Sequence, residues 1–419
     1  MSEPKTVKVL DLSRVAPPPP PGSEISLPRL KQSLALTLRH FFPFAANLIC
    51  PPPPNEPYIF YKEGDSVPFT VAESDADFNH LITNHARDAE EFHSLVAKLP
   101  FACVSSDLTH VVPVMAVQVT VFPNSGISIG VTFIHVAADG SSFNHFMKSW
   151  TSIYKSGGGD LTSLSLPYHN KDLIKDPDGL SSAFLKAWWN WENLGSAATV
   201  PEDNVRVTLV LNRGQIEKLK QLVMSTRSIS DDETGPLRVS TYAVTCAFMW
   251  VNLIKLQESE ISAHLHDNLV YHFISVSDCR ERFELPVPAT YFGNCLAWFF
   301  VPAKRSQLMG ENGIAFAAKA IGRTIYELKK GPFIGAEKWV SDLKEMLKQG
   351  RTVSVAGSPR LLVYETDFGW GRPKKTESVH IGAYGSFSLA ESRDEEGGVE
   401  IGLVICRDKL DVFHTIFEQ

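Results

Sequence analysis

The chain has 419 residues and a formal net charge of −7, with 40 Lys plus Arg against 47 Asp plus Glu. This balance lacks the basic excess with which proteins hold a polyanion, so we expect no nucleic-acid partner. With 44% hydrophobic residues, the composition is typical of a globular protein with a sizeable core and excludes a disordered chain.

The sequence gives no sign of export or of a membrane span. No charged N-terminal region followed by an apolar run is present, and no stretch approaches the roughly 20 uninterrupted apolar residues that a span needs. The six cysteines lie far apart, without the Cys-x-x-Cys spacing of a zinc or redox site. We therefore expect a cytoplasmic monomer with free thiols, no metal site and no membrane contact.

Hydrophobic periodicity predicts the main elements in chain order. Apolar residues at helical spacing predict a helix over 30–41, and two β-rich runs around a Pro-Asn-Ser-Gly turn predict a hairpin over 115–135. His135 ends the second run. A helix with apolar residues from Phe143 to Ile153 is expected after the cap residues Asp139-Gly140-Ser141. A short aromatic helix is predicted near 184–191, in the connecting region. The second half is predicted to open with a strand over 205–211, followed by helices over 213–224 and 242–256.

A short internal similarity suggests two related halves. The run from Gly126 to His135 aligns without gaps with the run from Gly398 to Arg407, and each leads into a helical pattern. Chance similarity of two Gly-containing strands is the alternative. If the halves are related, only the first carries a histidine at the strand end.

The strongest chemical candidate is His135, followed four residues later by Asp139. A neutral imidazole at a strand end can accept a proton, and a nearby carboxylate can fix the local geometry. The spacing alone is a weak signal, because about one such match is expected by chance among 13 histidines. A core histidine without chemical function is the alternative.

Two other patterns favour structural interpretations. Ser128 stands in a Gly-x-Ser-x-Gly pattern, but it lies inside a β-alternating run rather than at the strand-to-helix turn that a serine hydrolase needs. His264 and His266 could bind a metal, yet they lie in a polar stretch with no third ligand at a fixed offset. We expect a solvated loop there.

Three motifs in order give a more specific signal than any one. They are His135-x-x-x-Asp139-Gly140, Tyr291-Phe-Gly-Asn-Cys295 and Asp367-Phe-Gly-Trp-Gly371. Together they resemble the plant BAHD acyltransferases over nearly the whole chain, in particular the clade of anthocyanin and flavonoid glucoside malonyltransferases. The second motif is the one that points to the glucoside-acylating clade.

The resemblance implies an α/β fold of two chloramphenicol-acetyltransferase-like domains, each of mixed sheet plus helices, with a channel between them. It implies that His135 is the catalytic base, reached by the acyl-CoA from one face and by the hydroxyl acceptor from the other. The expected division of the chain is 1–178 for the N-terminal domain with the catalytic histidine, 179–203 for a crossover connection, and 204–419 for the C-terminal domain.

Structural and binding roles follow from the same resemblance. Asp139 is expected to point away from the substrates toward an arginine, for which Arg280 is the best match. The loop with Asp367, Gly369 and Gly371 is expected to be structural. For CoA, the resemblance implies the segment of Ser240 and Thr241 at a helix start, where exposed N–H groups favour phosphate.

The expected reaction is malonyl transfer from malonyl-CoA to a sugar hydroxyl of a flavonoid, anthocyanin or other phenolic glucoside. We expect direct attack assisted by His135 as general base, with both substrates small molecules and no permanently bound cofactor. One alternative keeps the fold and base but uses a hydroxycinnamoyl-CoA donor. Another is a non-catalytic protein that binds the glucoside or CoA without turnover.

One departure from the family pattern concerns the N-terminal region. Related chains usually carry several tens of residues, with a Pro-Leu-Thr-Phe-Phe-Asp type segment, between the first strand and the helix predicted over 30–41. Here the proline run Pro17–Pro21 leads almost directly into that helix.

Overall fold

A mixed four-stranded sheet forms the framework of the first half. The computed structural model describes residues 7–15, 27–100, 103–158, 164–176, 178–189, 203–226, 239–259, 265–382 and 385–417. The strand order is β1-β4-β8-β9, with β4 parallel to β8 and the other pairs antiparallel. The bounds are β1 (Val7–Val15), β4 (Val67–Ser74), β8 (Met115–Phe122) and β9 (Gly126–Phe133). The predicted hairpin over 115–135 is therefore present, formed by β8 and β9.

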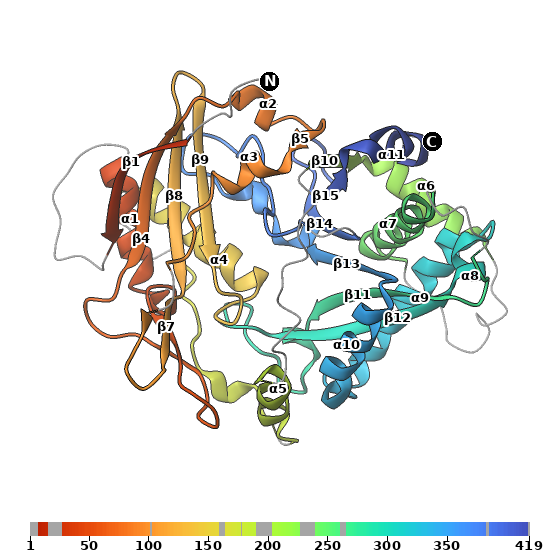
Figure 1. The fold of residues 1–419 in the computed structure, drawn as a ribbon, viewed down its shortest axis with the longest axis horizontal. Helices are drawn as coiled ribbons and strands as arrows, with labels where there is room; N and C mark the ends of the chain where they lie inside the picture. The colour runs from red at the N-terminus through yellow and green to blue at the C-terminus, as the bar shows by residue number, and fades with distance from the viewer. Residues whose placement is uncertain are drawn as a thin grey trace.

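Two helices pack together on this sheet, α1 (Leu27–Leu38) and α4 (Gly140–Ser156) (Figure 1). Their apolar side chains and those of the sheet form one buried cluster. The helix predicted over 30–41 ends at Leu38, although the backbone N–H of Phe41 still bonds to the carbonyl oxygen of Thr37 at 3.0 Å. A short 3₁₀ turn, Phe42–Phe44, follows directly after the predicted end.

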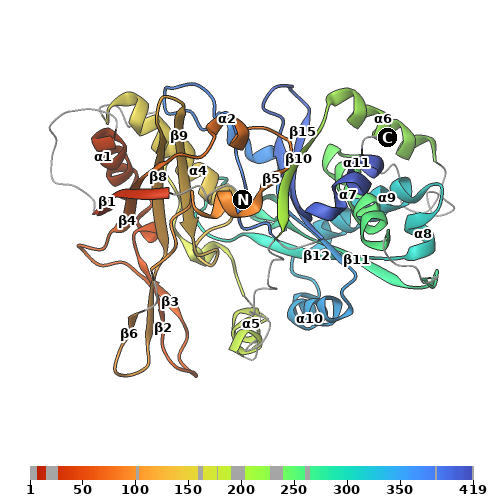
Figure 2. The same ribbon diagram turned by 45° about the horizontal axis from the view of Figure 1, so that its top comes forward.

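A smaller antiparallel sheet extends from the first half (Figure 2). Its order is β3-β2-β7-β6, with bounds β2 (Asn47–Cys50), β3 (Tyr58–Phe60), β6 (Cys103–Val104) and β7 (His110–Pro113). Three short elements lie between β4 and β6 along the chain: α2 (Phe78–Leu81), β5 (Arg87–Asp88) and α3 (Ala89–His93).

The second half is built on a larger sheet of order β12-β11-β13-β14-β15-β10-β5. Its strands are β10 (Asn204–Leu211), β11 (Val270–Asp278), β12 (Leu296–Lys304), β13 (Thr352–Gly357), β14 (Ser386–Glu391) and β15 (Val399–Cys406). The helices are α6 (Arg213–Ser225), α7 (Thr241–Glu258), α8 (Arg305–Met309), α9 (Gly313–Glu327), α10 (Trp339–Gln349) and α11 (Leu410–Phe417).

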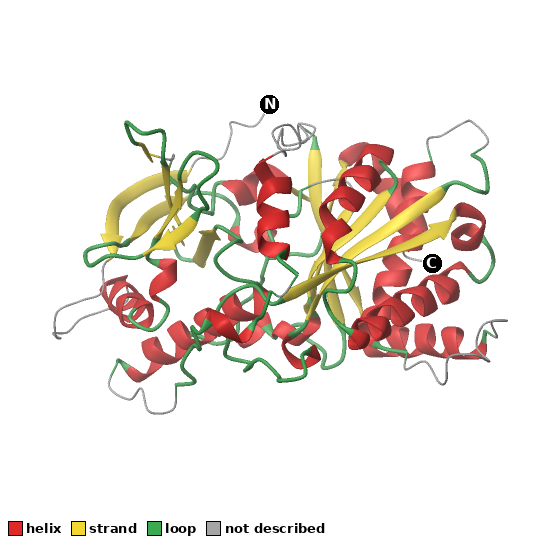
Figure 3. Cartoon of the chain, turned by 90° about the horizontal axis from the view of Figure 1, so that it is seen from below, coloured by secondary structure: helices red, strands yellow, loops and turns green. Residues whose placement is uncertain are grey.

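The helix α7 lies at the centre of the second core. Most of its residues are buried, and they share one cluster with side chains of the large sheet and of α9 and α11. An amphipathic pattern is weak in such a helix because apolar neighbours surround it. Figure 3 shows strands of the two halves separated along the long axis, with helices packed against both groups.

The two halves are joined by more than the connecting chain. The strand β5 of the first half pairs with β10 and so forms an edge of the large sheet. Conversely, Phe292 and Phe368 of the second half are buried in the first-half cluster. The helix α5 (Leu180–Trp189) lies in the connection, between the halves in Figure 1.

The internal similarity corresponds to similar local structure in the two halves. Both aligned segments form a strand followed by a helix, β9 before α4 and β15 before α11. However, β9 is an edge strand, whereas β15 lies between β14 and β10. The neighbours on the other side correspond: β8 is antiparallel to β9 and parallel to β4, and β14 is antiparallel to β15 and parallel to β13. The two sheets therefore share this local order and differ beyond it, where β10 and β5 extend the large sheet.

The described residues were also searched for membrane-spanning helices, metal sites and disulfides. No helix among them is long and apolar enough to cross a membrane, and no group of His, Cys, Asp and Glu side chains among them could hold a metal ion. All six cysteines are free thiols. Residues 16–26, which contain the proline run, and His264 lie outside the described residues.

Candidate active site

His135 lies in the turn just after β9, two residues beyond its end. Its side chain is exposed, and its ring stacks loosely on Phe133, with ring centroids 6.3 Å apart. A buried imidazole without solvent access is thereby excluded. The channel expected between the halves stays a prediction, as does the catalytic role of this histidine.

Asp139, four residues later, has a different environment, because it is fully buried. Its Oδ1 accepts a hydrogen bond from the backbone N–H of Ser142 at 2.9 Å, which makes Asp139 the N-cap of α4. Its Oδ2 accepts from the backbone N–H of Cys295 at 3.0 Å. The carboxylate thus fixes the start of α4 and cannot reach a substrate in the solvent around His135.

Arg280 completes the surroundings of Asp139, as the resemblance implied. Its guanidinium makes a bidentate ion pair with the carboxylate, with N–O distances of 2.9 and 3.0 Å. Asp278 adds a second carboxylate at 2.9 Å. Burial alone would lower the pKa of Arg280, but the two carboxylates outweigh this effect and raise the pKa above its ordinary value.

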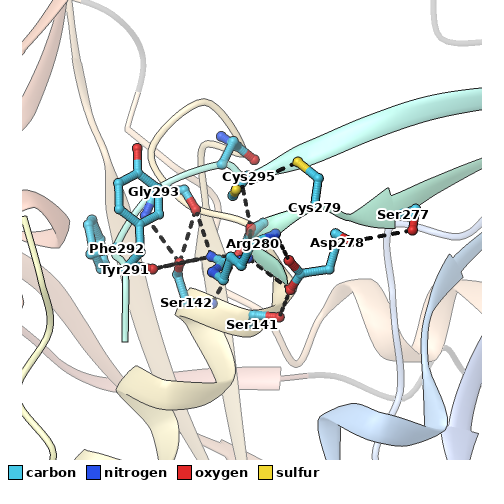
Figure 4. Close-up of polar contacts among 12 residues, drawn as sticks. Ser141, Ser142, Ser277, Asp278, Cys279, Arg280, Tyr291, Phe292, Gly293 and Cys295 are labelled. Atoms are coloured by element: carbon cyan, nitrogen blue, oxygen red, sulfur yellow. Dashed lines mark hydrogen bonds and ion pairs between the residues drawn. The ribbon is translucent and has the colours of Figure 1, made fainter. Parts of the chain in front are cut away.

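The same guanidinium also organises the neighbouring loop (Figure 4). It donates to the carbonyl oxygens of Tyr291 and Gly293 at 3.2 and 3.4 Å, and to the hydroxyl of Ser142 at 3.2 Å. That hydroxyl in turn accepts from the backbone N–H of Gly293 at 3.1 Å. The helix start that carries Asp139 and the motif that starts at Tyr291 therefore share one buried polar network.

Asn294 links this network to the candidate base. Its side-chain amide donates to the carbonyl oxygens of His135 at 2.8 Å and of Val136 at 3.2 Å. The backbone that carries the imidazole is therefore held by a residue 159 positions later in the chain. The sequence does not predict this contact, although Asn294 lies in one of the three motifs, because a backbone acceptor leaves no signal in side-chain chemistry.

The loop that begins at Asp367 is held by its own carboxylate and by aromatic packing. The carboxylate accepts from the backbone N–H groups of Gly369 and Gly371 at 2.7 and 3.0 Å, and both glycines have positive φ. Phe368 is buried against Trp150 of α4, with ring centroids 5.1 Å apart. These contacts support the structural role expected for the loop and leave it outside the chemistry.

The predicted CoA segment lies at the start of α7. Ser240 is the N-cap of this helix, and its hydroxyl accepts from the backbone N–H of Ala243 at 3.1 Å. Thr241 is the first helical residue. The helix terminus has the geometry that favours phosphate, and CoA binding there remains a prediction.

The competing serine pattern lacks the required geometry. Ser128 lies in the middle of β9, opposite Thr120 of β8, and not at a strand-to-helix turn. Gly130, the last glycine of the pattern, faces the backbone of Leu95, where any Cβ would clash. The second glycine therefore serves close packing rather than a nucleophile elbow.

Comparisons with known proteins agree with this arrangement. The model of the transferase family matches residues 20–419. A coumaroyl-CoA:anthocyanidin 3-O-glucoside-6''-O-coumaroyltransferase of Arabidopsis thaliana is 41% identical over 94% of this chain and 85% of its own length. A malonyl-coenzyme:anthocyanin 5-O-glucoside-6'''-O-malonyltransferase of Salvia splendens is 36% identical over 93% and 83%. Among solved structures, vinorine synthase matches with a TM-score of 0.67 and 19% identity over 99% of this chain and 98% of its own.

The fold and the motif network define an acyl-CoA-dependent acyltransferase with the mixed α/β architecture of chloramphenicol-acetyltransferase-like proteins. The chain belongs to the BAHD family, and its relatives include acyltransferases and malonyltransferases that act on anthocyanin and phenolic glucosides. The family resemblance predicted from the three motifs is therefore confirmed.

Proposed function

We propose that this protein transfers an acyl group from a CoA thioester to a glucosyl hydroxyl of an anthocyanidin or related phenolic glucoside, with His135 as the general base. The observation that carries the proposal is the exposed imidazole on a backbone held by Asn294. The activities of the relatives supply the substrate class. The buried pairing of Asp139 with Arg280 supports the rigid helix start behind the base.

In this mechanism, the imidazole of His135 accepts the proton of the sugar hydroxyl as its oxygen attacks the thioester carbonyl. The tetrahedral intermediate then collapses, and CoA leaves as a thiol after taking up that proton. General-base assistance typically contributes about 10²–10⁴-fold, and orientation of the two substrates supplies much of the rest. Asp139 takes no part in proton transfer, because its oxygens are occupied by N–H donors.

For the donor, we place a hydroxycinnamoyl-CoA first. Two coumaroyltransferases of Arabidopsis thaliana are 41% and 40% identical to this chain, whereas the malonyltransferases of Salvia splendens and Dahlia pinnata reach 36% and 35%. This order differs from the sequence-based expectation, which named malonyl-CoA first.

Malonyl-CoA is the second candidate, and Lys171 is the observation in its favour. A malonyl carboxylate needs a cationic partner, but Arg280 is buried and already paired. The ammonium of Lys171 belongs to an exposed residue and donates to the carbonyl oxygen of Phe292, beside the loop that holds His135. Its Nζ also lies 4.8 Å from the ring centroid of Tyr291.

The test offers the purified chain coumaroyl-CoA and malonyl-CoA in turn, with an anthocyanidin 3-O-glucoside, and identifies products by mass spectrometry. We expect His135→Ala to lower kcat at least 100-fold. The control variant His110→Ala, at an exposed residue of β7 in the smaller sheet, should leave kcat unchanged. If the parent chain transfers malonyl groups, and Lys171→Met abolishes malonyl transfer but not coumaroyl transfer, malonyl-CoA is the donor. Absence of transfer by the parent chain with both donors would favour the non-catalytic binder.

A further inference from the structure

Asn294 is an exposed polar side chain directly beside the candidate base. Its Nδ2 donates to the carbonyl oxygens of His135 at 2.8 Å and of Val136 at 3.2 Å. A carbonyl oxygen only accepts hydrogen bonds, so the amide nitrogen has to face these two groups, and the orientation of the carboxamide is fixed. The amide oxygen Oδ1 is therefore left for another partner.

Covalent geometry places this oxygen close to the residue that carries the imidazole. In an amide, the oxygen and nitrogen atoms are about 2.2 Å apart, as the bond lengths of the group require. Since Nδ2 lies 2.8 Å from the carbonyl oxygen of His135, Oδ1 lies within about 5 Å of that oxygen. Both residues are exposed, so one small molecule in the surrounding solvent is able to contact the imidazole and the amide oxygen together.

Oδ1 differs from the other acceptors of its loop in being free. The carbonyl oxygens of Tyr291, Phe292 and Gly293, which precede Asn294, already accept hydrogen bonds from side chains of the protein. Among the residues that the structure describes, none donates a hydrogen bond to Oδ1. An amide oxygen has two lone pairs, so it is available to an O–H or N–H donor of a ligand.

The chemistry of the two substrates indicates which of them supplies this donor. The reacting end of an acyl-CoA is a thioester, whose carbonyl oxygen and sulfur offer acceptors but no donor. A glucosyl group, in contrast, carries O–H donors on neighbouring carbon atoms. When one of its hydroxyls faces the imidazole, a neighbouring hydroxyl can donate to Oδ1.

We propose that Oδ1 of Asn294 accepts a hydrogen bond from a glucosyl hydroxyl of the acceptor, next to the hydroxyl that His135 deprotonates. The inference rests on the proposed function, because it names a further contact of the same substrate. Asn294 holds the backbone of His135 through Nδ2 and the sugar through Oδ1. One side chain thereby fixes the position of the acceptor relative to the base, and such orientation contributes to the rate.

The test compares Asn294→Ala with the matched control Asn55→Ala. Asn55 is also exposed, and its Nδ2 donates to the carbonyl oxygen of Pro52 at 3.4 Å, in the loop between β2 and β3. Both variants are made in the His135→Ala background, so that no effect acts through the imidazole. By calorimetry, we expect Asn294→Ala to weaken the Kd of an anthocyanidin 3-O-glucoside about 3- to 10-fold, the usual effect of one lost neutral hydrogen bond. The Kd of coumaroyl-CoA should change less than twofold, and Asn55→Ala should change neither Kd.

Glucosides that each lack one glucosyl hydroxyl distinguish a direct contact from an effect on the turn. The glucoside without the contacted hydroxyl should bind the His135→Ala chain about 3- to 10-fold more weakly, and Asn294→Ala should then cost almost nothing more. The other deoxy glucosides should keep the full loss. An unchanged Kd for the intact glucoside, or an equal loss for every glucoside in the set, would overturn the contact.

The activity of the unmodified chain separates this inference from the proposed function. Acyl transfer without any coupling between Asn294 and a glucosyl hydroxyl would refute the contact and leave the enzyme. Coupling in a chain that transfers no acyl group from either donor would retain the contact and reject the enzyme.

Discussion

Replacement of Arg280 by alanine is the sharpest test of the network behind His135. The carboxylate of Asp139 is fully buried and accepts two backbone N–H bonds besides its bidentate pair with the guanidinium. Arg280→Ala leaves that negative charge buried with only the two N–H donors. Removal of one partner of a buried pair typically costs about 3–5 kcal/mol, and we expect a loss of this size in the free energy of unfolding.

The matched control is Arg407→Ala. Arg407 pairs with Asp203 at 2.6 Å, but both side chains are about half-exposed or more, so this pair is worth about 0–1 kcal/mol. Urea denaturation followed by tryptophan fluorescence measures both variants, and the eight tryptophans supply the signal. Equal losses in the two variants would refute the reasoning, because burial would then have no effect.

A double variant examines the cause of the loss. In Asp139→Asn combined with Arg280→Met, neither buried charge remains, so we expect a smaller destabilisation than the sum of the two single changes. Losses that simply add would show that each side chain stabilises the fold independently. The ion pair would then not explain the cost of removing Arg280.

Three further predictions concern neighbouring features. Asn294→Ala should lower kcat about tenfold or more with an unfolding cost of only about 1 kcal/mol, checked by steady-state kinetics beside urea denaturation. Phe368→Ala should cost about 3–5 kcal/mol in thermal unfolding, while Trp370→Ala, at a half-exposed ring, should cost clearly less. The pKa of His145 is lowered, mainly by desolvation, so the unfolded chain binds more protons and stability should fall as the pH drops below 6.5. Urea midpoints at pH 7.5 and 5.5 measure this, and His145→Leu should reduce the difference.

The local elements could be predicted because their signals are local. Alternating apolar residues predicted the hairpin of β8 and β9, and helical spacing predicted α4 and, within two residues at each end, α7. The cap at Asp139 followed from its place before the helix. Position in the sheet could not be predicted this way, because β15 pairs on one side with β10, which comes from a distant part of the chain.

The candidate site was predictable only in part, for a related reason. His135 carries chemistry in its own side chain, so a motif could identify it. Arg280 was matched to Asp139 only through the family resemblance, since 141 residues separate them. Asn294 acts on backbone carbonyls, and any residue offers such an acceptor. Contacts of this kind become visible only when the fold brings the two segments together.

Two of the three motifs share a local pattern that can be recognised in a sequence. In each, a phenylalanine directly precedes a glycine: Phe292 before Gly293, and Phe368 before Gly369. Both aromatic side chains belong to the second half but are buried in the first-half core. Both glycines have φ in the range that other residues avoid, 142° and 95°.

The positive φ redirects the chain immediately after the buried ring. After Gly293 the next residue, Asn294, faces back to the carbonyl of His135, and after Gly369 the next ring, Trp370, lies against Tyr154 of α4. At two points, therefore, a buried phenylalanine ring followed by a change of chain direction at a glycine attaches the second half to the first. Since one of these points holds the backbone of the base, the interface between the halves and the geometry of the base are expected to change together when either anchor is removed.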